Sequence, residues 1–285
     1  MRRIIVTGAN GQLGTALREE FDQRSDFDVR YTDADTLDIT DEAAVRTYID
    51  SFKPEIVINA AAYTNVDKAE SEPELCRTIN AIAPGILAAV CADYGTKLIH
   101  ISTDYVFSGK ATRPYRESDP TDPCSVYGRT KLEGEELVRH YLPDAHMILR
   151  TAWLYSRTGH NFVKTMLTLA ADHDEIGVVA DQWGSPTYAP VLAQAVLTAI
   201  SAKKWHPGTY HLTGNGRTTW YDFARAIFSE AGITTLHVNS LTTESYPTPA
   251  TRPAYSVLDC SKFCKTFSFE IPDWRVSLHT FFQDL

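Results

Sequence analysis

The sequence has no long hydrophobic run, no block of basic residues, no internal repeat and no low-complexity tract. The apolar run that opens the chain, residues 4–6, ends at Gly8 and is too short for a signal peptide or a membrane-spanning helix. The net charge is −9, and Lys and Arg are scattered, which argues against nucleic acid as the main partner. We therefore expect a globular cytoplasmic protein with neither a nucleic-acid nor a membrane partner.

Cysteine is also sparse, and its arrangement excludes two classes of site. The five cysteines form no pairs of pairs with the spacing of metal ligands, and an odd number fits a reducing compartment. The carboxylates form no cluster that suggests a metal site either. We expect packed thiols and no bound metal.

What the sequence does contain is a regular alternation of apolar runs and helical stretches over the first 150 residues. Short runs rich in β-branched residues, typical of strands buried on both faces, lie at residues 3–7, 29–33, 54–59, 97–103 and 147–150. Strict alternation of strand and helix specifies a right-handed, doubly wound parallel sheet. The predicted fold class is therefore α/β and Rossmann-like.

A glycine-rich turn follows the first predicted strand directly. Residues 8–14, GANGQLG, place Gly8, Gly11 and Gly14 three residues apart, a variant of the dinucleotide-binding fingerprint. In that motif one glycine allows the tight turn, one lets a pyrophosphate approach the backbone, and one allows close helix packing. A glycine-rich turn alone is weak evidence, but its place between a strand and a helix favours a nucleotide site.

An acidic residue ends the second predicted strand. Asp33 lies about twenty residues beyond the last glycine, where a carboxylate commonly binds the 2′-hydroxyl of an adenosine ribose. It favours NADH, because a carboxylate repels a 2′-phosphate, although Arg30 is near enough in sequence to keep NADPH open. The structural alternative is an aspartate in a surface turn. Asp38 and Ile39 follow and are candidates for the border of the adenine.

A tyrosine and a lysine lie four residues apart in a predicted helix. Tyr127 and Lys131 share one helix face, so an ammonium lies beside a phenol. Lowering a tyrosine pKa by about three units takes on the order of 4 kcal/mol of phenolate stabilisation, and Lys131 is placed to supply much of it. The alternative is that Tyr127 packs and Lys131 faces solvent. Thr103 ends the strand at 97–103, at the sheet edge where ligands bind, unless it only caps that strand.

Taken in order, residues 7–14, 102–107, 127–131 and 150–155 resemble the extended short-chain dehydrogenase/reductase family, over nearly the whole chain. More specific segments are 59–70, 161–166 and 246–253. The resemblance implies reduction of the C4 keto group of dTDP-4-dehydro-L-rhamnose by NADH or NADPH, giving dTDP-L-rhamnose. The partner is then a small nucleotide sugar, and the chain acts as a monomer or a homodimer, which the sequence does not decide.

The resemblance also implies roles for individual residues. Tyr127 would be the general acid, Lys131 would bind the nicotinamide ribose and lower the pKa of Tyr127, and Thr103 would hydrogen-bond the same oxygen. Asp104 and Trp153 match positions that contact the sugar, although Trp153 equally suits core packing. Positions that line the cofactor correspond to Gly11, Gln12, Leu13, Asp33, Asp38, Ile39, Ala62, Tyr63 and Thr64.

The composition of the chain changes after Arg150, where tryptophans and tyrosines become frequent and the predicted strands become shorter. We expect residues 1–150 to form the dinucleotide-binding domain, with residues 186–213 returning to its sheet, and residues 151–285 to supply an interleaved substrate-binding region. In the proline-rich segment 246–253, Arg252 is a candidate for gripping a diphosphate, unless it is a solvent-facing loop charge.

Related activities on the same fold stay open. A dehydratase of this family would need an acid after Thr103 and Asp104, and Tyr105 stands there instead. An epimerase-reductase would add a Cys/His pair; Cys124 is close in sequence, but no matching histidine is evident. A catalytically silent regulatory subunit would be expected to lose part of the set Thr103, Tyr127 and Lys131, and all three are present.

Overall fold

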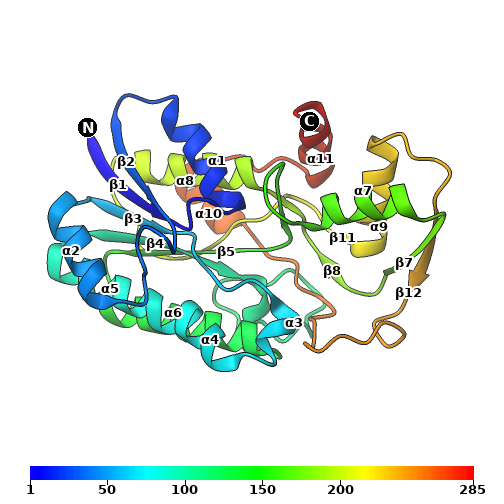
Figure 1. Cartoon of the computed structure of the whole chain (residues 1–285), viewed down its shortest axis with the longest axis horizontal. Coiled ribbons are helices and arrows are strands. Elements are labelled where there is room, and N and C mark those ends of the chain that lie inside the picture. Colours follow the sequence, from blue (N-terminus) through cyan, green and yellow to red (C-terminus); the bar gives the residue numbers. More distant parts are fainter.

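The computed structural model describes all 285 residues, and its larger part is a six-stranded parallel sheet between two layers of helices (Figure 1). The strands are β1 (Arg2–Thr7), β2 (Phe27–Thr32), β3 (Ile56–Asn59), β4 (Lys97–Thr103), β5 (His146–Thr151) and β10 (Gly208–His211). Their order across the sheet is β10-β5-β4-β3-β1-β2, and every neighbouring pair is parallel. The predicted doubly wound α/β fold is confirmed.

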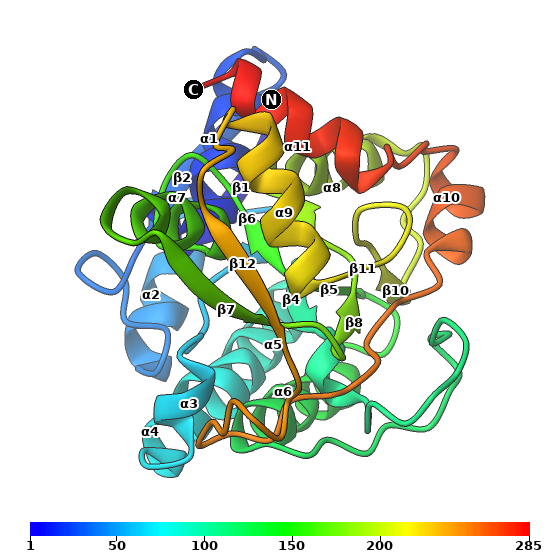
Figure 2. The ribbon, with the colours of Figure 1, turned by 90° about the vertical axis from the view of Figure 1, so that its right-hand side faces the viewer.

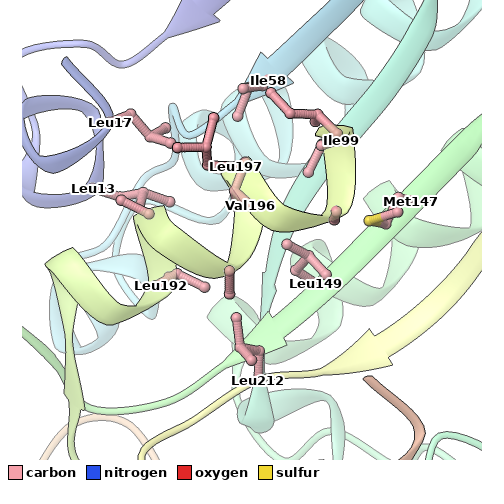
Figure 3. Close-up of a cluster of buried hydrophobic side chains, with 14 of the residues drawn as sticks. Leu13, Leu17, Ile58, Ile99, Met147, Leu149, Leu192, Val196, Leu197 and Leu212 are labelled. Carbon is pink, nitrogen blue, oxygen red and sulfur yellow. The ribbon is translucent and has the colours of Figure 1, made fainter. Parts of the chain in front are cut away.

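The central strands are apolar on both faces because both faces are covered. Within β1, Ile4 and Val6 point into one core and Ile5 into the other. The first core lies under α1 (Gln12–Asp22), α8 (Ala189–Ser201) and α10 (Ser261–Phe267). Figure 3 shows α8 in this core, with Leu192, Val196 and Leu197 among side chains of α1 and of the sheet. Burial on both sides explains why these strands read as continuous apolar runs.

The opposite face is covered by α2 (Glu42–Phe52), α5 (Ala83–Tyr94) and α6 (Val126–Tyr141). The helix α5 continues a run that begins with α4 (Pro73–Arg77) and passes through the π-helix η1 (Thr78–Ile82). Pro84 has no N–H to donate to the carbonyl of Asn80, four residues earlier, and the wider π turn lies directly before it.

By length and composition alone, the run Pro73–Tyr94 would suffice to cross a bilayer. However, 56% of its most apolar window is buried inside the protein, where α5 packs against α2, α6 and β4. Its position in the core accounts for its apolar composition.

A smaller lobe stands beside the carboxyl ends of the strands, seen in Figure 2 with α9 and the β7/β12 ribbon towards the viewer. Its helices are α7 (Phe162–Asp172), α9 (Trp220–Glu230) and α11 (Trp274–Gln283). Its strands are β6 (Leu154–Tyr155), β7 (Glu175–Val179), β8 (Trp183–Gly184), β9 (Thr187–Tyr188), β11 (Thr218–Thr219) and β12 (His237–Leu241). A separate core that includes Tyr155, Phe223, Trp274 and Phe281 holds it together.

The chain passes between the two lobes more than once. It leaves the sheet after β5, builds β6 to β9, returns through α8 to β10, and leaves again for β11, α9 and β12. The helix α10 then packs on the same face of the main sheet as α8, against β10, before α11 closes the smaller lobe. Neither lobe is therefore one continuous segment of the chain.

Candidate active site

A cavity of about 1340 Å³ lies at the carboxyl ends of the strands, between the main sheet and the smaller lobe. This is the edge where open α/β sheets bind ligands. The residues singled out from the sequence that line it are Gly8, Gly11, Gln12, Leu13, Gly14, Asp33, Asp38, Ile39, Ala62, Thr64, Thr103, Asp104, Tyr127, Lys131, Trp153 and Arg252.

The glycine-rich turn forms the floor of one end of this cavity. Gly8 has a φ of +66°, and a Cβ on Gly14 would lie 2.3 Å from the Gly8 carbonyl oxygen, so both positions need glycine. The helix α1 follows with Gly11 as its N-cap residue and no side-chain cap, which leaves its first amide groups free to donate. A diphosphate fits this cradle by shape and by charge.

Asp33 lines the cavity beside the glycine-rich turn. Its two carboxylate oxygens accept hydrogen bonds from the backbone N–H groups of Asn10 at 2.9 Å and Ala34 at 2.8 Å. These bonds hold the carboxylate beside the glycine-rich turn. The cavity wall from Asp33 to Thr40 contains no Lys or Arg.

Three residues that the sequence analysis considered as candidates for the site do not line the cavity. The guanidinium of Arg30 lies over the ring of Phe52, 4.2 Å from its centre. Cys124 is exposed on the loop before α6. Tyr63, a candidate cofactor contact, turns its hydroxyl to Glu72, to which it donates at 2.7 Å.

The backbone of Tyr63 nevertheless shapes the cavity wall between Ala62 and Thr64. Its N–H donates to the side-chain oxygen of Asn80 at 2.9 Å, and its carbonyl accepts from the Asn80 amide at 3.0 Å. Asn80 is buried within the π turn. The irregular helix therefore fixes a loop that the sequence alone did not connect with it.

Tyr127 stands in the first turn of α6, which is pressed against the end of β4. Ser125 caps this helix by accepting from the Gly128 N–H at 3.1 Å, and a Cβ on Gly128 would lie 2.3 Å from the carbonyl oxygen of Tyr105. The rings of Tyr127 and Tyr105 meet edge to face, with centres 5.6 Å apart. This contact and the cap orient Tyr127 in the cavity.

The electrostatics of Tyr127 differ from the sequence-based expectation. Burial raises the pKa of its phenol, and the Thr103 hydroxyl only partly opposes the shift. The lowering by Lys131 inferred from the helix spacing is not what the structure gives, because Lys131 is not among the groups that shift the Tyr127 pKa and burial sets its direction. The phenol is therefore firmly protonated at neutral pH in this structure.

Lys131 is buried one turn further along α6. Its ammonium nitrogen donates to the Ile101 carbonyl at 2.6 Å and lies 3.5 Å from Nε2 of His100. Burial lowers the pKa of Lys131 to about 8. Its side chain points at the end of β4, so both Lys131 and Tyr127 reach the cavity but face different neighbours.

Asp104 is a buried carboxyl with one oxygen unpaired. Its Oδ1 accepts from the Thr103 hydroxyl at 3.0 Å, while Oδ2 has no hydrogen-bond partner. Burial raises the pKa of Asp104 to about 6. Because it lines the cavity, the free oxygen is available to a hydroxyl donor on a ligand.

Arg252 reaches the cavity from the proline-rich segment of the smaller lobe. It donates to Asp67 at 2.7 Å and to the hydroxyl of Tyr105 at 3.2 Å. Asp67 also accepts from the Ala250 N–H at 3.2 Å, which fastens the segment to the loop after β3. Arg252 is thus held near Tyr105 rather than free in solvent.

Trp153 forms part of an aromatic wall that sequence reasoning only half anticipated. It has a φ of +47° and stacks on Trp220, and Phe162 lies beside Trp220. Trp220 and Phe162 also line the cavity. The one sequence signal for them was the crowding of aromatic residues after Arg150.

One side chain joins the glycine-rich turn to the smaller lobe. The oxygen of Gln12 accepts from the Asn161 amide at 3.1 Å and from the Ser156 hydroxyl at 3.2 Å. Asn161 is also the N-cap of α7, through its bond from the Lys164 N–H. The first residue of α1 is thereby fastened to the start of α7.

Comparison with known proteins gives full-length matches. The family described as "RmlD substrate binding domain" matches residues 1–285. The dTDP-4-dehydrorhamnose reductase of Aggregatibacter actinomycetemcomitans is 43% identical, over 98% of this chain and 97% of its own. The spore coat polysaccharide biosynthesis protein SpsK of Bacillus subtilis is 42% identical, over 100% and 98%. The crystal structure of dTDP-4-dehydrorhamnose reductase from Bacillus anthracis in complex with NADP is 40% identical, with a TM-score of 0.95 and complete coverage of both chains.

Proposed function

Since this chain belongs to the RmlD substrate binding domain family, we propose that it reduces the C4 keto group of dTDP-4-dehydro-L-rhamnose to give dTDP-L-rhamnose. The chain is an oxidoreductase that uses a nicotinamide cofactor. The observation that carries the proposal is the meeting of Tyr127, Lys131 and Asp104 with a glycine-rich dinucleotide turn in one cavity. We expect the reaction in the cytoplasm, catalysed by a monomer or a homodimer.

The residues of the turn fit the cofactor's diphosphate. Gly8, Gly11 and Gly14 let it approach the backbone, and the free amides at the start of α1 donate to it. Gln12, Leu13, Asp38, Ile39, Ala62 and Thr64 line the remaining path of the dinucleotide.

Asp33 favours NADH. Its carboxylate suits a ribose 2′-hydroxyl, and the wall beside it offers no cation to a 2′-phosphate. Arg30, the nearest candidate cation in sequence, lies against Phe52 instead. The Bacillus anthracis relative was solved with NADP, so the preference of this chain is open to direct measurement.

The bound cofactor supplies a hydride to the carbonyl carbon. Tyr127 donates a proton to the carbonyl oxygen as negative charge develops there. A phenol with a raised pKa remains protonated until a strong base, the developing alkoxide, accepts its proton. The Thr103 hydroxyl, which donates to Asp104 in this structure, redirects its one hydrogen to the same oxygen, and Lys131 holds the nicotinamide ribose with its ammonium.

Contacts to the sugar come from both lobes. The unpaired oxygen of Asp104 accepts from a sugar hydroxyl, Trp153 provides an apolar wall, and Arg252 binds the diphosphate of the nucleotide. We accordingly propose that residues 1–150 with 186–213 bind the cofactor, and that the rest of 151–285 binds the nucleotide sugar.

Elimination of water, the reaction of related dehydratases, would need a second acid near Asp104. Tyr105 occupies that place and its hydroxyl accepts from Arg252. This position favours plain reduction over dehydration.

A direct assay tests the proposal. The protein is given dTDP-4-dehydro-L-rhamnose, oxidation of NADH and NADPH is followed separately, and the product is identified by NMR. We expect dTDP-L-rhamnose and one oxidised cofactor per product. An epimerised or dehydrated product, or binding of the substrate without turnover, would contradict the proposal.

A further inference from the structure

A chain of buried polar side chains lies behind Lys131, inside the sheet. It runs from Thr7 at the end of β1 through Asn59 of β3 to His100 of β4, and ends at Lys131. All four residues are buried, with at most 2% of their surface exposed. Each hydrogen position is therefore dictated by its neighbours, because water does not compete.

The orientation of the Asn59 amide is fixed by a backbone donor. Its side-chain oxygen accepts from the Ala61 N–H at 3.2 Å and from the Thr7 hydroxyl at 2.7 Å. Since a backbone N–H only donates, the oxygen of Asn59 must face Ala61. The amide nitrogen is then the atom that faces Nδ1 of His100, at 3.1 Å.

This orientation determines the tautomer of His100. An amide nitrogen only donates, so Nδ1 of His100 must accept. Burial, with a contribution from the Lys131 charge, holds the pKa of His100 well below its usual range, so the ring is neutral. A neutral ring that accepts at Nδ1 carries its hydrogen on Nε2.

The Nε2–H bond of His100 therefore faces the Lys131 nitrogen at 3.5 Å. An ammonium group has no lone pair and cannot accept this hydrogen, whereas a neutral amine can. The Ile101 carbonyl, 2.6 Å away, takes a hydrogen from either form.

The remaining groups around Lys131 do not cancel this preference. Glu135, the nearest carboxylate on α6, favours the ammonium, but it is already paired with Arg150 at 2.7 Å and with the Ser102 hydroxyl. Cys76 on α4 contributes a smaller effect, and its own pKa is raised by burial, so it is an uncharged thiol at neutral pH.

We propose that His100 is a positioning residue for Lys131: held by Asn59 in the Nε2–H tautomer, it turns a donor towards the lysine nitrogen and so stabilises the neutral amine relative to the ammonium. The charge of Lys131 then depends on pH just above neutrality, rather than being permanent. Burial by itself already lowers the pKa of Lys131 to about 8, so the contribution of His100 rests on the hydrogen-bond geometry alone. His100 contacts neither the cavity nor the expected ligands.

The first test needs no variant and no turnover. In unliganded protein labelled with ¹³C and ¹⁵N, the ring nitrogens of His100 are assigned and followed from pH 6 to 9. We expect a protonated Nε2 and an unprotonated Nδ1 throughout. A hydrogen on Nδ1, or a doubly protonated ring, would overturn the proposal.

The second test measures Lys131 itself. Its pKa is read from the ¹³Cε shift in the wild type, in His100→Phe and in the control His146→Phe, which alters a buried histidine of β5 that bonds the Leu142 carbonyl instead. We expect His100→Phe to raise the pKa of Lys131 by about one unit and His146→Phe to leave it unchanged. No change in His100→Phe, or an equal change in both variants, would refute it. If His100→Phe does not fold, the tautomer measurement on the wild-type protein still tests the proposal.

A third measurement, the pH dependence of kcat/KM, rests on the proposed function. If Lys131 acts as its ammonium, the alkaline decline of kcat/KM moves to higher pH in His100→Phe by the same shift. Because the two NMR measurements are made without substrate, they succeed or fail independently of the assigned reaction.

Discussion

Trp153 and Trp220 stack face to face in the wall of the cavity, with ring centres 3.5 Å apart and planes 10° from parallel. Trp153 follows β5, and Trp220 opens α9, so the stack joins the main sheet to the smaller lobe. Its geometry depends on Gly184, because a Cβ there would lie 2.4 Å from the Trp153 indole.

Gly184→Ala is therefore expected to displace Trp153 and to weaken nucleotide-sugar binding. We expect KM for the sugar to rise about tenfold, since a misplaced wall costs on the order of 1.4 kcal/mol, while the cofactor Kd stays unchanged. Steady-state kinetics and cofactor titration measure the two. Gly177→Ala in β7 is the control, because its added Cβ meets only the flexible end of Leu241. An equal rise in KM in both variants would mean that the smaller lobe is destabilised in general, and would contradict a specific role of Gly184 in placing Trp153.

Removing the Tyr127 hydroxyl is expected to abolish most of the catalysis. Tyr127→Phe keeps the ring and its edge contact with Tyr105 but loses the proton donor, so kcat should fall by about 10²- to 10⁴-fold with little change in cofactor Kd. Tyr141→Phe, an exposed tyrosine of the same helix, serves as control. Near-normal turnover in Tyr127→Phe would remove Tyr127 as the acid.

The Asp33 carboxylate is expected to set the cofactor preference. Asp33→Ser removes the charge that repels a 2′-phosphate, so the ratio of kcat/KM for NADPH over NADH should rise about tenfold. Asp35→Ser, an exposed neighbour that does not line the cavity, should leave this ratio unchanged. An unaltered ratio in Asp33→Ser would mean that the carboxylate does not approach the ribose.

The raised pKa of Asp104 predicts two pH effects. Its pKa of about 6 lies above its unfolded value, so the folded state binds more protons between about pH 4 and 6, and stability falls as pH rises through that window. In the wild type, the free energy of unfolding should fall by roughly 3 kcal/mol across this window because of Asp104, and in Asp104→Asn this fall should be absent. Urea unfolding at several pH values measures it.

Substrate binding should show the opposite trend. The carboxylate accepts a sugar hydroxyl and the protonated acid does not do so as well, so KM for the sugar should rise as pH falls below 6 in the wild type. In Asp104→Asn, KM should be raised and nearly constant with pH. A wild-type KM that does not change across pH 6 would place the titration elsewhere.

Much of the fold follows from local patterns in the sequence. The apolar runs predicted the strands of the main sheet because burial on both faces removes polar alternation. The glycine spacing located the turn that forms the floor of one end of the cavity, and the separation of Tyr127 and Lys131 placed both on one helix that reaches it, because helix geometry is local.

What the sequence did not predict depends on contacts between distant segments. The pKa of Tyr127 is raised because its surroundings are buried, and burial is a property of the whole fold. The contact of Lys131 with His100 needs the pairing of α6 with β4. The family resemblance implied that Tyr63 lines the cofactor, but its hydroxyl turns to Glu72. Trp220 enters the cavity only because the start of α9 is stacked on Trp153, which is far from it in sequence.

The passage of the chain back and forth between the lobes has a consequence for synthesis. The edge strand β10 of the main sheet comes after most of the smaller lobe's first segment, and α10, which covers it, comes later still. A nascent polypeptide released at residue 150 would leave one side of β5 without a neighbour and α1 without α8. Completion of either half therefore waits until nearly all of the chain has emerged from the ribosome, and gene truncation at the apparent border would not yield an autonomous unit.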